Sequence, residues 1–141
     1  MSDTVQARIA QSFARQGLMT TLGARLAWVG EGEVHIALPH APGLSQQQGF
    51  VHAGAIAAIA DSACGYAALT QVPAQDEVVT AEFKINLLRP AIGQRFLAIG
   101  RVLHAGRRLS VCSAEVRAFA DAGDAFKVVA LMQATIARVG A

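Results

Sequence analysis

The chain has 141 residues, a formal net charge of +2, 53% hydrophobic residues and only 16% charged residues. Its length suits a single domain. The high hydrophobicity excludes an intrinsically disordered chain, and the lack of any long basic run argues against a nucleic-acid-binding protein. The charge is also uneven, because Asp61 is the only charged residue between Glu33 and Asp76.

The sequence predicts neither a membrane span nor a leader. The uncharged stretch over residues 34–60 is interrupted by Pro39, Pro42 and three successive glutamines, whereas a spanning helix needs about 20 mostly apolar residues. The first residues show no basic segment followed by an apolar one, so we expect no signal peptide and a cytoplasmic protein. Cys64 and Cys112 form no CxxC pair, which predicts buried thiols in a reducing compartment.

The first half of the chain predicts two helices that flank a pair of strands. Residues 3–17 carry apolar side chains at helical spacing, with a polar cap at the start and a glycine at the end. Residues 27–29 and 34–38 are typical of strands joined by a glycine-containing turn. A polar loop over residues 41–49 leads into a helix over residues 52–71, which is apolar almost all round and should be buried.

The second half of the chain alternates between apolar and polar residues, as a strand with one buried face does. We expect four long strands here, over residues 78–88, 94–104, 109–119 and 126–138. In the first of these, the odd-numbered residues from Val79 to Leu87 should share one face, and Thr80 should lie on the other.

This order of elements predicts an α+β fold. Strands grouped on either side of one helix and joined by short links favour an antiparallel sheet and do not fit βαβ winding. We therefore expect about six strands in a sheet that curves around the long central helix. Small residues on one face of the strand over residues 109–119 would let that helix lie close. The whole chain, residues 1–141, should form this single domain.

Several common catalytic and binding motifs are missing from the sequence. There is no GxSxG nucleophile elbow, no GxGxxG fingerprint and no Walker loop. The four histidines lack the spacing of metal ligands, and the two cysteines lie far apart. We therefore expect no metal site.

Asp61 is the first candidate for chemistry. Burying a carboxylate without a partner costs several kcal/mol, so Asp61 needs either a partner on a neighbouring element or a function. A ligand or another backbone could approach this carboxylate closely, because its neighbours on the helix face are small. At helical spacing these neighbours are Gly54, Ala57, Ala58, Cys64, Gly65 and Ala68.

The segment over residues 46–54 is the second candidate. It carries three glutamines and leads into the start of the helix, where free N–H groups and the positive end of the helix dipole suit an oxyanion. Alternatively, His52 could serve only as the N-terminal cap of the helix, and the glutamines could lie in a solvated loop without a functional role. A donor-rich loop, a helix N-terminus and a carboxylate about two and a half turns further along together indicate a hydrolytic site.

Basic residues form the third group of candidates, because nine of the twelve lysines and arginines follow residue 71. Arg89, Arg95, Arg107 and Arg108 stand at strand ends or turns. Such residues could bind the phosphates of a nucleotide-tailed substrate. A solvated sheet edge explains them equally well.

Two segments carry a family resemblance. GFVHAGAIAAIADSA, over residues 49–63, and VTAEFKINLLRPA, over residues 79–91, occur at a characteristic separation. They resemble the two signature motifs of the hotdog-fold acyl-CoA thioesterases, most closely those of the phenylacetate-degradation branch. The order of elements is similar from about residue 20 to the end. The resemblance implies a hotdog fold, in which two subunits join their sheets and two active sites lie at the dimer interface.

The resemblance also implies roles for individual residues. Asp61 would act as a general base on water or as a nucleophile on the thioester. The N–H of Ala53 and the amide of Gln46 would bind the thioester oxygen from the other subunit, and Thr80 would position water.

The first motif departs from the family at one position. This chain has His52, Ala53 and Gly54 where His-Gly-Gly is commoner. Alanine keeps its N–H, so the oxyanion role survives if Ala53 has a negative φ, as the first turn of a helix requires.

We therefore expect an enzyme that hydrolyses an acyl- or aroyl-CoA to the free acid and CoA. The CoA moiety belongs to the substrate, so no separate cofactor is expected, and neither nucleic acid nor membrane is an expected partner. The apolar composition argues against a monomer. It does not distinguish a dimer from a homotetramer formed as a dimer of dimers. A non-catalytic acyl-CoA-binding module on the same fold is the alternative, whereas a hotdog hydratase would need an Asp–His pair about five residues apart that the sequence lacks.

Overall fold

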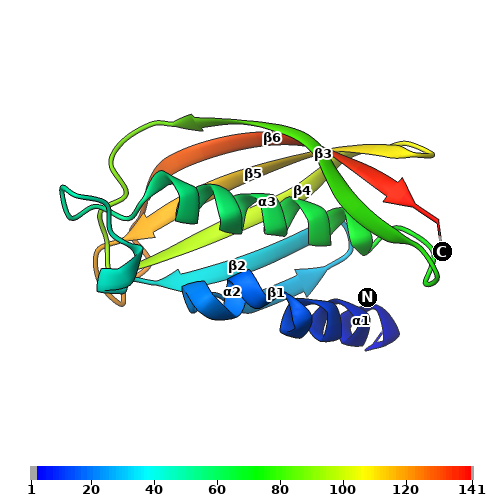
Figure 1. Ribbon diagram of the computed structural model, residues 1–141, viewed down its shortest axis with the longest axis horizontal. Coiled ribbons are helices and arrows are strands. Elements are labelled where there is room, and N and C mark those ends of the chain that lie inside the picture. The colour runs from blue at the N-terminus through cyan, green and yellow to red at the C-terminus, as the bar shows by residue number, and fades with distance from the viewer. Residues whose placement is uncertain (1–2, 141) are drawn as a thin grey trace.

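In the computed structural model, which describes residues 3–140, one antiparallel sheet of six strands curves around a long helix (Figure 1). The strand order is β1-β2-β4-β5-β6-β3. This confirms the α+β hotdog fold; residues 1, 2 and 141 of the predicted domain lie outside the described residues. The strands are β1 (Arg25–Gly30), β2 (Glu33–Pro39), β3 (Glu77–Leu87), β4 (Arg95–Ala105), β5 (Leu109–Phe119) and β6 (Lys127–Val139).

The N-terminal helix predicted over residues 3–17 is present, two residues shorter at its end, and a second short helix that was not predicted follows it. Helix α1 (Asp3–Arg15) ends before Gln16, which has an extended backbone with φ −82° and ψ 97°. Gly17 begins helix α2 (Gly17–Leu22), so the prediction that a glycine at this position ends the helix is wrong. The glycine that does end a helix is Gly23, which caps α2 with φ 78°. Since Gln16 stands at the break, its side chain can turn towards the central helix.

The central helix α3 (Ala53–Leu69) is two residues shorter at its C-terminal end than predicted and fills the concave side of the sheet. Its inner side is fully buried, with Ile59, Ala60 and Ala63 at 0% exposure. It comes closest to the sheet at Gly100 in β4, where an added Cβ would lie 2.4 Å from the backbone carbonyl of Ala63. No helix among residues 3–140 is long and apolar enough to cross a membrane.

The small-residue face predicted for the fifth strand is confirmed. Along β5, four small or medium side chains point towards α3 and are at most 5% exposed. They let the helix pack closely against the sheet. They are Cys112, Ala114, Val116 and Ala118.

A bulge in β3 changes which of its side chains face α3. Thr80 pairs with Ile136 and Glu82 pairs with Thr135, so one residue between them has no partner across the ladder. Ile136 is buried on the concave side, which places Thr80 on that side too. Phe83 lies opposite the buried Ala134 and faces the same way. The predicted strict alternation along this strand, with Thr80 and Phe83 on opposite faces, is therefore wrong.

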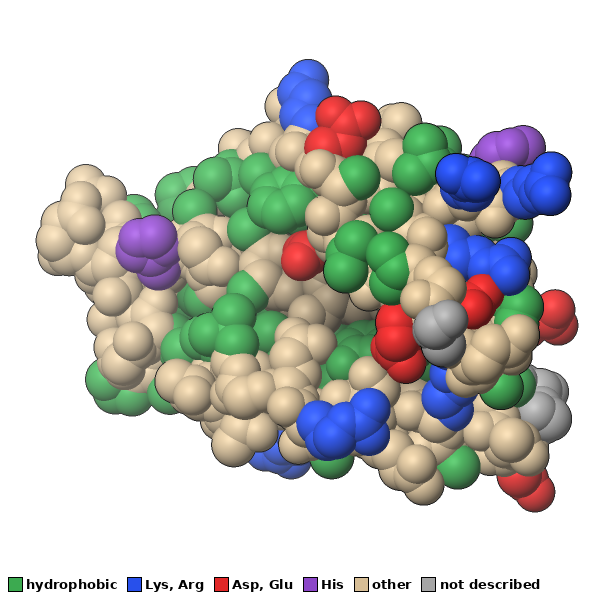
Figure 2. Space-filling view, turned by 45° about the vertical axis from the view of Figure 1, so that its right-hand side comes forward, with side chains coloured by type: hydrophobic (Ala, Val, Ile, Leu, Met, Phe, Trp, Pro, Cys, Tyr) green, Lys and Arg blue, Asp and Glu red, His purple; other side chains and the backbone are tan. Residues whose placement is uncertain are grey.

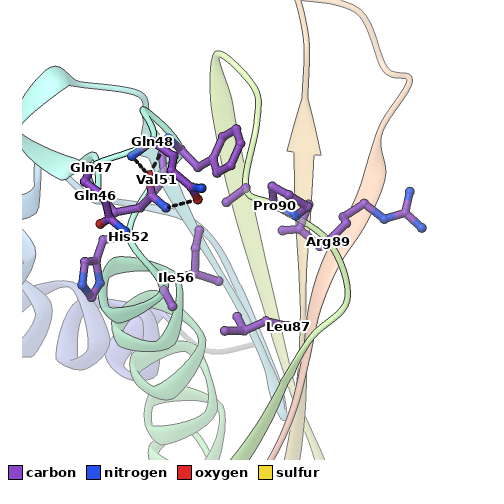
Figure 3. A pocket seen from close by; sticks show the side chains of 13 residues that line it. Gln46, Gln47, Gln48, Val51, His52, Ile56, Leu87, Arg89 and Pro90 are labelled. Carbon is purple, nitrogen blue, oxygen red and sulfur yellow. Dashed lines mark hydrogen bonds between the residues drawn. The ribbon is translucent and has the colours of Figure 1, made fainter.

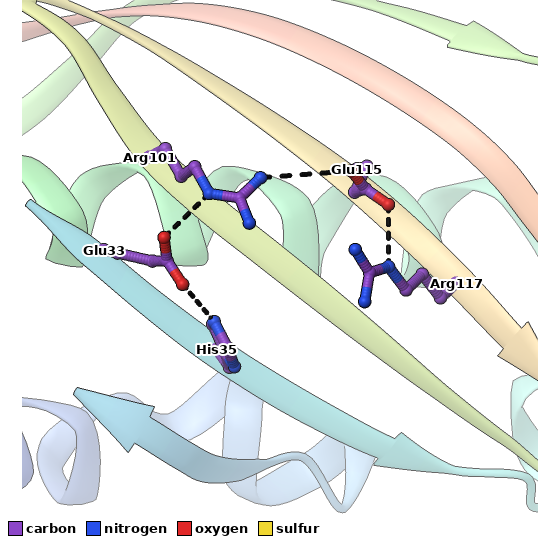
Figure 4. A network of polar contacts seen from close by, with 5 residues as sticks. All are labelled: Glu33, His35, Arg101, Glu115 and Arg117. Atoms are coloured by element: carbon purple, nitrogen blue, oxygen red, sulfur yellow. Dashed lines mark hydrogen bonds and ion pairs between the residues drawn. The ribbon is translucent and has the colours of Figure 1, made fainter. Parts of the chain in front are cut away.

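The convex face of the sheet carries a charge network across β2, β4 and β5 (Figure 4). Glu33 accepts hydrogen bonds from Arg101 Nε at 2.7 Å and contacts His35 Nε2 at 2.6 Å. Glu115 accepts from Arg117 Nε at 2.7 Å and lies 4.0 Å from Arg101. Burial works to raise the pKa of Glu33, but its contacts with His35 and Arg101 outweigh burial and lower that pKa. The network lies on the side of the sheet away from α3.

Candidate active site

Asp61 and Thr80 form a hydrogen-bonded pair between α3 and β3. Thr80 Oγ1 donates to Asp61 Oδ1 at 2.6 Å, which is possible because the β3 bulge turns Thr80 towards the helix. The sequence suggested that Asp61 needs a partner or a function, and Thr80 is that partner. Within the described part of the chain, Asp61 Oδ2 has no hydrogen-bond partner. A carboxylate held by one oxygen and open at the other can take a proton from water or attack a carbonyl carbon.

The carboxylate borders a cavity of about 340 Å³ between α3, β3 and the N-terminal helices. Figure 2 shows a hollow on this side of the molecule, with hydrophobic side chains gathered around it. Part of the cavity wall is polar. Besides Asp61 and Thr80, its polar members are Ser12, Gln16, Ser62, Tyr66 and Glu77.

These cavity residues were missed by sequence reasoning. Tyr66 stands five positions after Asp61 on α3, so helical spacing does not place it on the stripe that carries the carboxylate. Ser12 and Gln16 come from the other end of the chain. The spacing of the apolar residues around them predicts a helix, but it does not indicate against which part of the protein that helix packs.

The start of α3 presents one free backbone donor. His52 caps the helix, because its Nδ1 accepts a hydrogen bond from the N–H of Gly54 at 2.7 Å. The N–H of Gly54 is thereby used. The N–H of Ala53 has no acceptor among residues 3–140, and no non-glycine residue there has a positive φ. Ala53 therefore has the negative φ that its role as an oxyanion donor requires.

Ala53 lines a second cavity, of about 500 Å³, at the end of the molecule where α3 begins (Figure 3). The loop before the helix forms one wall and the end of β3 forms another. The loop is tied to the segment after β3, since the N–H of Val51 donates to the carbonyl of Ala91 at 3.1 Å. The wall residues also include Gln46, Gln47, Gln48, His52, Ile56, Leu87 and Arg89.

Gln46 is largely engaged in shaping its own loop. Its backbone N–H donates to the carbonyl of Phe50 at 2.8 Å, and its side-chain oxygen accepts from the N–H groups of Gln48 and Phe50 at 2.5 and 3.2 Å. Its Nε2 donates to Gln48 Oε1 at 3.2 Å. One side-chain N–H of Gln46 remains for a ligand.

The cavity at Asp61 and the cavity at Ala53 share no lining residue. Asp61 stands eight positions after Ala53 on α3, which amounts to about 12 Å along the helix axis. One thioester carbonyl therefore cannot touch both groups of the same chain. The structure places the two predicted halves of the site on one helix but does not bring them together within one subunit.

The four candidate phosphate-binding arginines are also separated. Arg89 lines the cavity at the start of α3, although its guanidinium points away from His52 (Figure 3). Arg95, the first residue of β4, donates to the carbonyl of Gly123 at 2.8 Å. Arg107 and Arg108 follow the last residue of β4 and so lie at the other end of the sheet. Only Arg89 of these four lines the described cavity at Ala53.

No group of three or more histidine, cysteine, aspartate or glutamate side chains that could hold a metal ion occurs among residues 3–140. The two cysteines are free and buried.

Comparison with known proteins identifies the family. The sequence profile of the thioesterase superfamily matches residues 48–123, which include both signature segments, residues 49–63 and 79–91. A crystal structure of a thioesterase family protein from Silicibacter pomeroyi is 40% identical, covers 97% of this chain and 99% of its own, and superposes with a TM-score of 0.93. A conserved protein from Pseudomonas aeruginosa is 32% identical, with 92% and 99% of the two chains covered and a TM-score of 0.81.

A third solved structure, the PaaI protein from the E. coli phenylacetic acid degradation operon, is similar in fold. It is 21% identical, the match covers 96% of this chain and 94% of that one, and the TM-score is 0.83. With its six-stranded sheet around α3 and a superfamily profile that spans more than half of its length, the chain belongs to the hotdog-fold thioesterases, and thioester hydrolysis is its general chemistry.

Proposed function

We propose that the protein hydrolyses acyl- or aroyl-CoA thioesters to the free acid and CoA, in a site completed by two copies of the chain. One observation carries this proposal: the open carboxylate of Asp61 and the free N–H of Ala53 lie about 12 Å apart along α3. Each group suits one half of a thioester hydrolysis. A second subunit that brings its own Ala53 to Asp61 would unite them.

The edge strand β3 offers the surface for that second subunit. It pairs only with β6 among the described strands, so its outer edge leaves N–H and C=O groups available to another strand. Its side chains are unusually exposed for apolar residues, with Val79 at 53%, Phe83 at 45% and Leu87 at 51%. Exposed apolar side chains on an open edge are typical of an interface between copies.

Antiparallel pairing of β3 with its own copy would assemble the site. Thr80 holds Asp61 near the beginning of β3, and Leu87 lines the cavity at Ala53 near its end. A twofold axis between these positions sets Thr80 of one subunit opposite the region of Leu87 in the other. Asp61 then faces the start of α3 of the partner subunit, and two equivalent sites form. A dimer is the smallest assembly that this site requires, and a dimer of dimers retains it.

The chemistry follows from these positions. The N–H of Ala53 and the positive end of the α3 dipole bind the thioester oxygen and stabilise the negative charge that develops there. Asp61, held by Thr80, either takes a proton from a water that attacks the carbonyl carbon or attacks that carbon itself. In the first route, the C–S bond breaks, the CoA thiolate takes the proton that Asp61 removed from water, and the acid leaves with the oxygen of that water. In the second route, C–S cleavage releases the CoA thiolate, which takes a proton from solvent, and leaves a mixed anhydride between Asp61 and the acyl group; a water then hydrolyses the anhydride to the free acid and restores Asp61. The remaining N–H of Gln46 is a second oxyanion donor.

The proposal also covers the CoA phosphates, the branch of the family and the location in the cell. Arg89 is the best placed of the four arginines for a CoA phosphate, because it lines the cavity at Ala53. A phenylacetate-type branch is supported by the two sequence segments, while the likeness to PaaI concerns the fold. The free, buried Cys64 and Cys112 support a cytoplasmic location.

Release of free CoA tests the proposed function. A panel of acyl- and aroyl-CoAs is incubated with the protein, and the free thiol is measured with a thiol reagent. We expect turnover of at least one thioester and a fall in kcat of about 10² to 10⁴ in the Asp61→Asn variant, the usual contribution of a positioned acid–base group. Tight binding of acyl-CoA without thiol release would instead favour the non-catalytic binding module.

A further inference from the structure

Helix α1 closes one side of the cavity at Asp61, although little of α1 is buried in the protein. Its last turn contributes Ser12 to the cavity wall, and Gln16 follows directly. Among the 13 residues of α1 only Ile9 is buried, whereas ten of the 17 residues of α3 are. Figure 1 shows α1 at the outer edge of the molecule, beside β1. An element with few buried apolar contacts detaches at a lower free-energy cost than the core unfolds.

The guanidinium of Arg8 fastens α1 to the loop between α3 and β3. It donates to the carbonyl of Val72 at 3.1 Å and to the carbonyl of Asp76. This loop is a firm anchor, because Asp76 is only 5% exposed and its carboxylate accepts a hydrogen bond from Arg138 Nε in β6. Hydrogen bonds from a charged donor are stronger than neutral ones, so Arg8 is the main polar hold on the middle of α1.

A hinge stands between α1 and α2. The backbone of Gln16 is extended, with φ −82° and ψ 97°, and interrupts the helical hydrogen bonds. The N–H of Gly17 has no acceptor among residues 3–140. Beyond the hinge, α2 is held by the buried side chain of Met19 and by its glycine cap. A rotation about residues 16 and 17 would therefore carry α1 outwards and leave α2 in place.

The closed position of α1 limits the length of an acyl group in the cavity. Tyr66 stands five residues beyond Asp61 on α3, about 7.5 Å along the axis, and its hydroxyl contacts α1. The cavity of about 340 Å³ has room for a ring or a short chain, whereas a longer straight chain meets α1. The surfaces on both sides of that seam are apolar, since Ile9 and Leu69 belong to one hydrophobic cluster and Phe13 packs against it. A chain that displaces α1 therefore finds apolar surface to cover.

We propose that α1 is a hinged end wall of the acyl site. Held closed by Arg8, it restricts the site to compact acyl groups, and swung out about Gln16 and Gly17 it admits long straight-chain ones. The inference rests on the proposed function, since it takes Asp61 as the end of the cavity where the thioester reacts. The apparent affinity for a long chain is lowered by the fraction of molecules in which α1 is open. Compact groups bind with α1 closed and do not depend on that fraction.

Two variants move the wall in opposite directions. Arg8→Ala removes the hold on the loop and should raise the ratio of kcat/KM for decanoyl-CoA to that for benzoyl-CoA about tenfold, mainly through a lower KM for decanoyl-CoA. Gly17→Pro should lower this ratio severalfold, because proline fixes φ at the hinge and restricts Gln16 to an extended backbone. Proline suits the first position of α2, where no described hydrogen bond is lost and an added Cβ meets nothing within 4 Å.

Arg15→Ala is the matched control for Arg8→Ala. The guanidinium of Arg15 donates to the carbonyl of Gln11 within α1 at 3.3 Å, so its loss should leave the ratio unchanged. Arg8→Lys keeps the charge and should raise the ratio less than Arg8→Ala; it is also the second variant, in case Arg8→Ala does not fold. Hydrogen exchange of the α1 amides, followed by mass spectrometry, should be faster in Arg8→Ala than in Arg15→Ala, while α3 stays protected in both.

The outcomes distinguish this inference from the proposed function. Equal ratios in the wild type, Arg8→Ala and Gly17→Pro would overturn the hinged wall and leave the hydrolysis standing. If neither thioester is hydrolysed, the proposed function fails, and hydrogen exchange in the presence of free decanoate or benzoate still decides. Faster exchange of α1 with decanoate than with benzoate would support the wall, and the same exchange with both would overturn it.

Discussion

The hydroxyl of Thr80 on β3 donates a hydrogen bond of 2.6 Å to the carboxylate of Asp61 on α3. The pair depends on the bulge that follows Thr80, because regular alternation with Phe83 would turn one of these two side chains to the convex face. The bulge thus gives Asp61 a fixed orientation while the apolar side chains further along β3 stay on the concave side.

Replacing Thr80 by valine should lower kcat about tenfold, because Asp61 loses the hydrogen bond that orients it. Serine keeps the hydroxyl, so Thr80→Ser should retain most of the activity. Steady-state thiol release from an acyl-CoA substrate compares the three proteins. Wild-type kcat in Thr80→Val would show that Thr80 does not position the carboxylate.

Removing the N–H of Ala53 should lower kcat by about 10² to 10³, the effect of losing one oxyanion donor. Ala53→Pro does this with little risk to the fold, because proline is favoured at the first position of a helix and His52 already has a compatible ψ of 138°. Ala53→Gly keeps the N–H and is the matched control. Circular dichroism checks that both variants fold, and equal kcat in the proline and glycine variants would rule out the oxyanion role.

Mixed dimers test whether Asp61 and Ala53 of different subunits form one site. Asp61→Asn and Ala53→Pro chains, co-expressed with different tags, should each be inactive alone. Random pairing makes half of the dimers mixed, and each mixed dimer has one site without either defect, so about a quarter of wild-type activity should return. If both residues served one site within the same chain, no mixture would regain activity.

Gly100→Ala should destabilise the protein by about 2 kcal/mol or more, because its Cβ would lie 2.4 Å from the carbonyl of Ala63 and force α3 away from β4. Gly65→Ala is the matched control, since a Cβ there meets nothing within 4 Å and alanine favours the helix. Urea denaturation should show opposite shifts of the midpoint for the two variants. Equal stability of Gly100→Ala and the wild type would contradict the close packing.

The buried thiols should make stability fall at alkaline pH. Burial raises the pKa of Cys112 to about 11, and burial, together with Cys112 and Asp61, raises that of Cys64 as well. In the unfolded chain both thiols ionise near pH 8.5, so from about pH 9 upwards the unfolded state loses protons that the folded state keeps. Each thiol then costs about 1.4 kcal/mol of unfolding free energy per pH unit, until the folded state ionises too.

Denaturation under reducing conditions at pH 7, 9 and 10.5 measures this effect. The double variant Cys64→Ala with Cys112→Ala should show a shallower decline over the same range, because its other titrating groups are unchanged. Parallel declines in the two proteins would mean that the thiols do not contribute.

The sequence by itself determined the elements of this fold. Alternation with period two predicted four long strands close to their observed bounds, because one face of each lies against the core. An apolar, alanine-rich stretch predicted the central helix within two residues at either end. The single carboxylate in a charge-poor region marked Asp61, and the residues before α3 marked the helix N-terminus, since both signals are local in the sequence.

Tertiary structure decided which residues meet. The β3 bulge depends on the ladder with β6, so alternation alone placed Thr80 on the wrong side relative to Phe83. The break at Gln16 brings α1 and α2 over α3 and creates the polar wall of the cavity at Asp61, which no local sequence pattern predicts. The separation of about 12 Å between Asp61 and Ala53 follows from the rise of an α-helix. Only the tertiary structure, with its two separate cavities, shows that the two residues do not share a site within one subunit. Local periodicity records burial, whereas contacts between distant segments arise only when those segments pack.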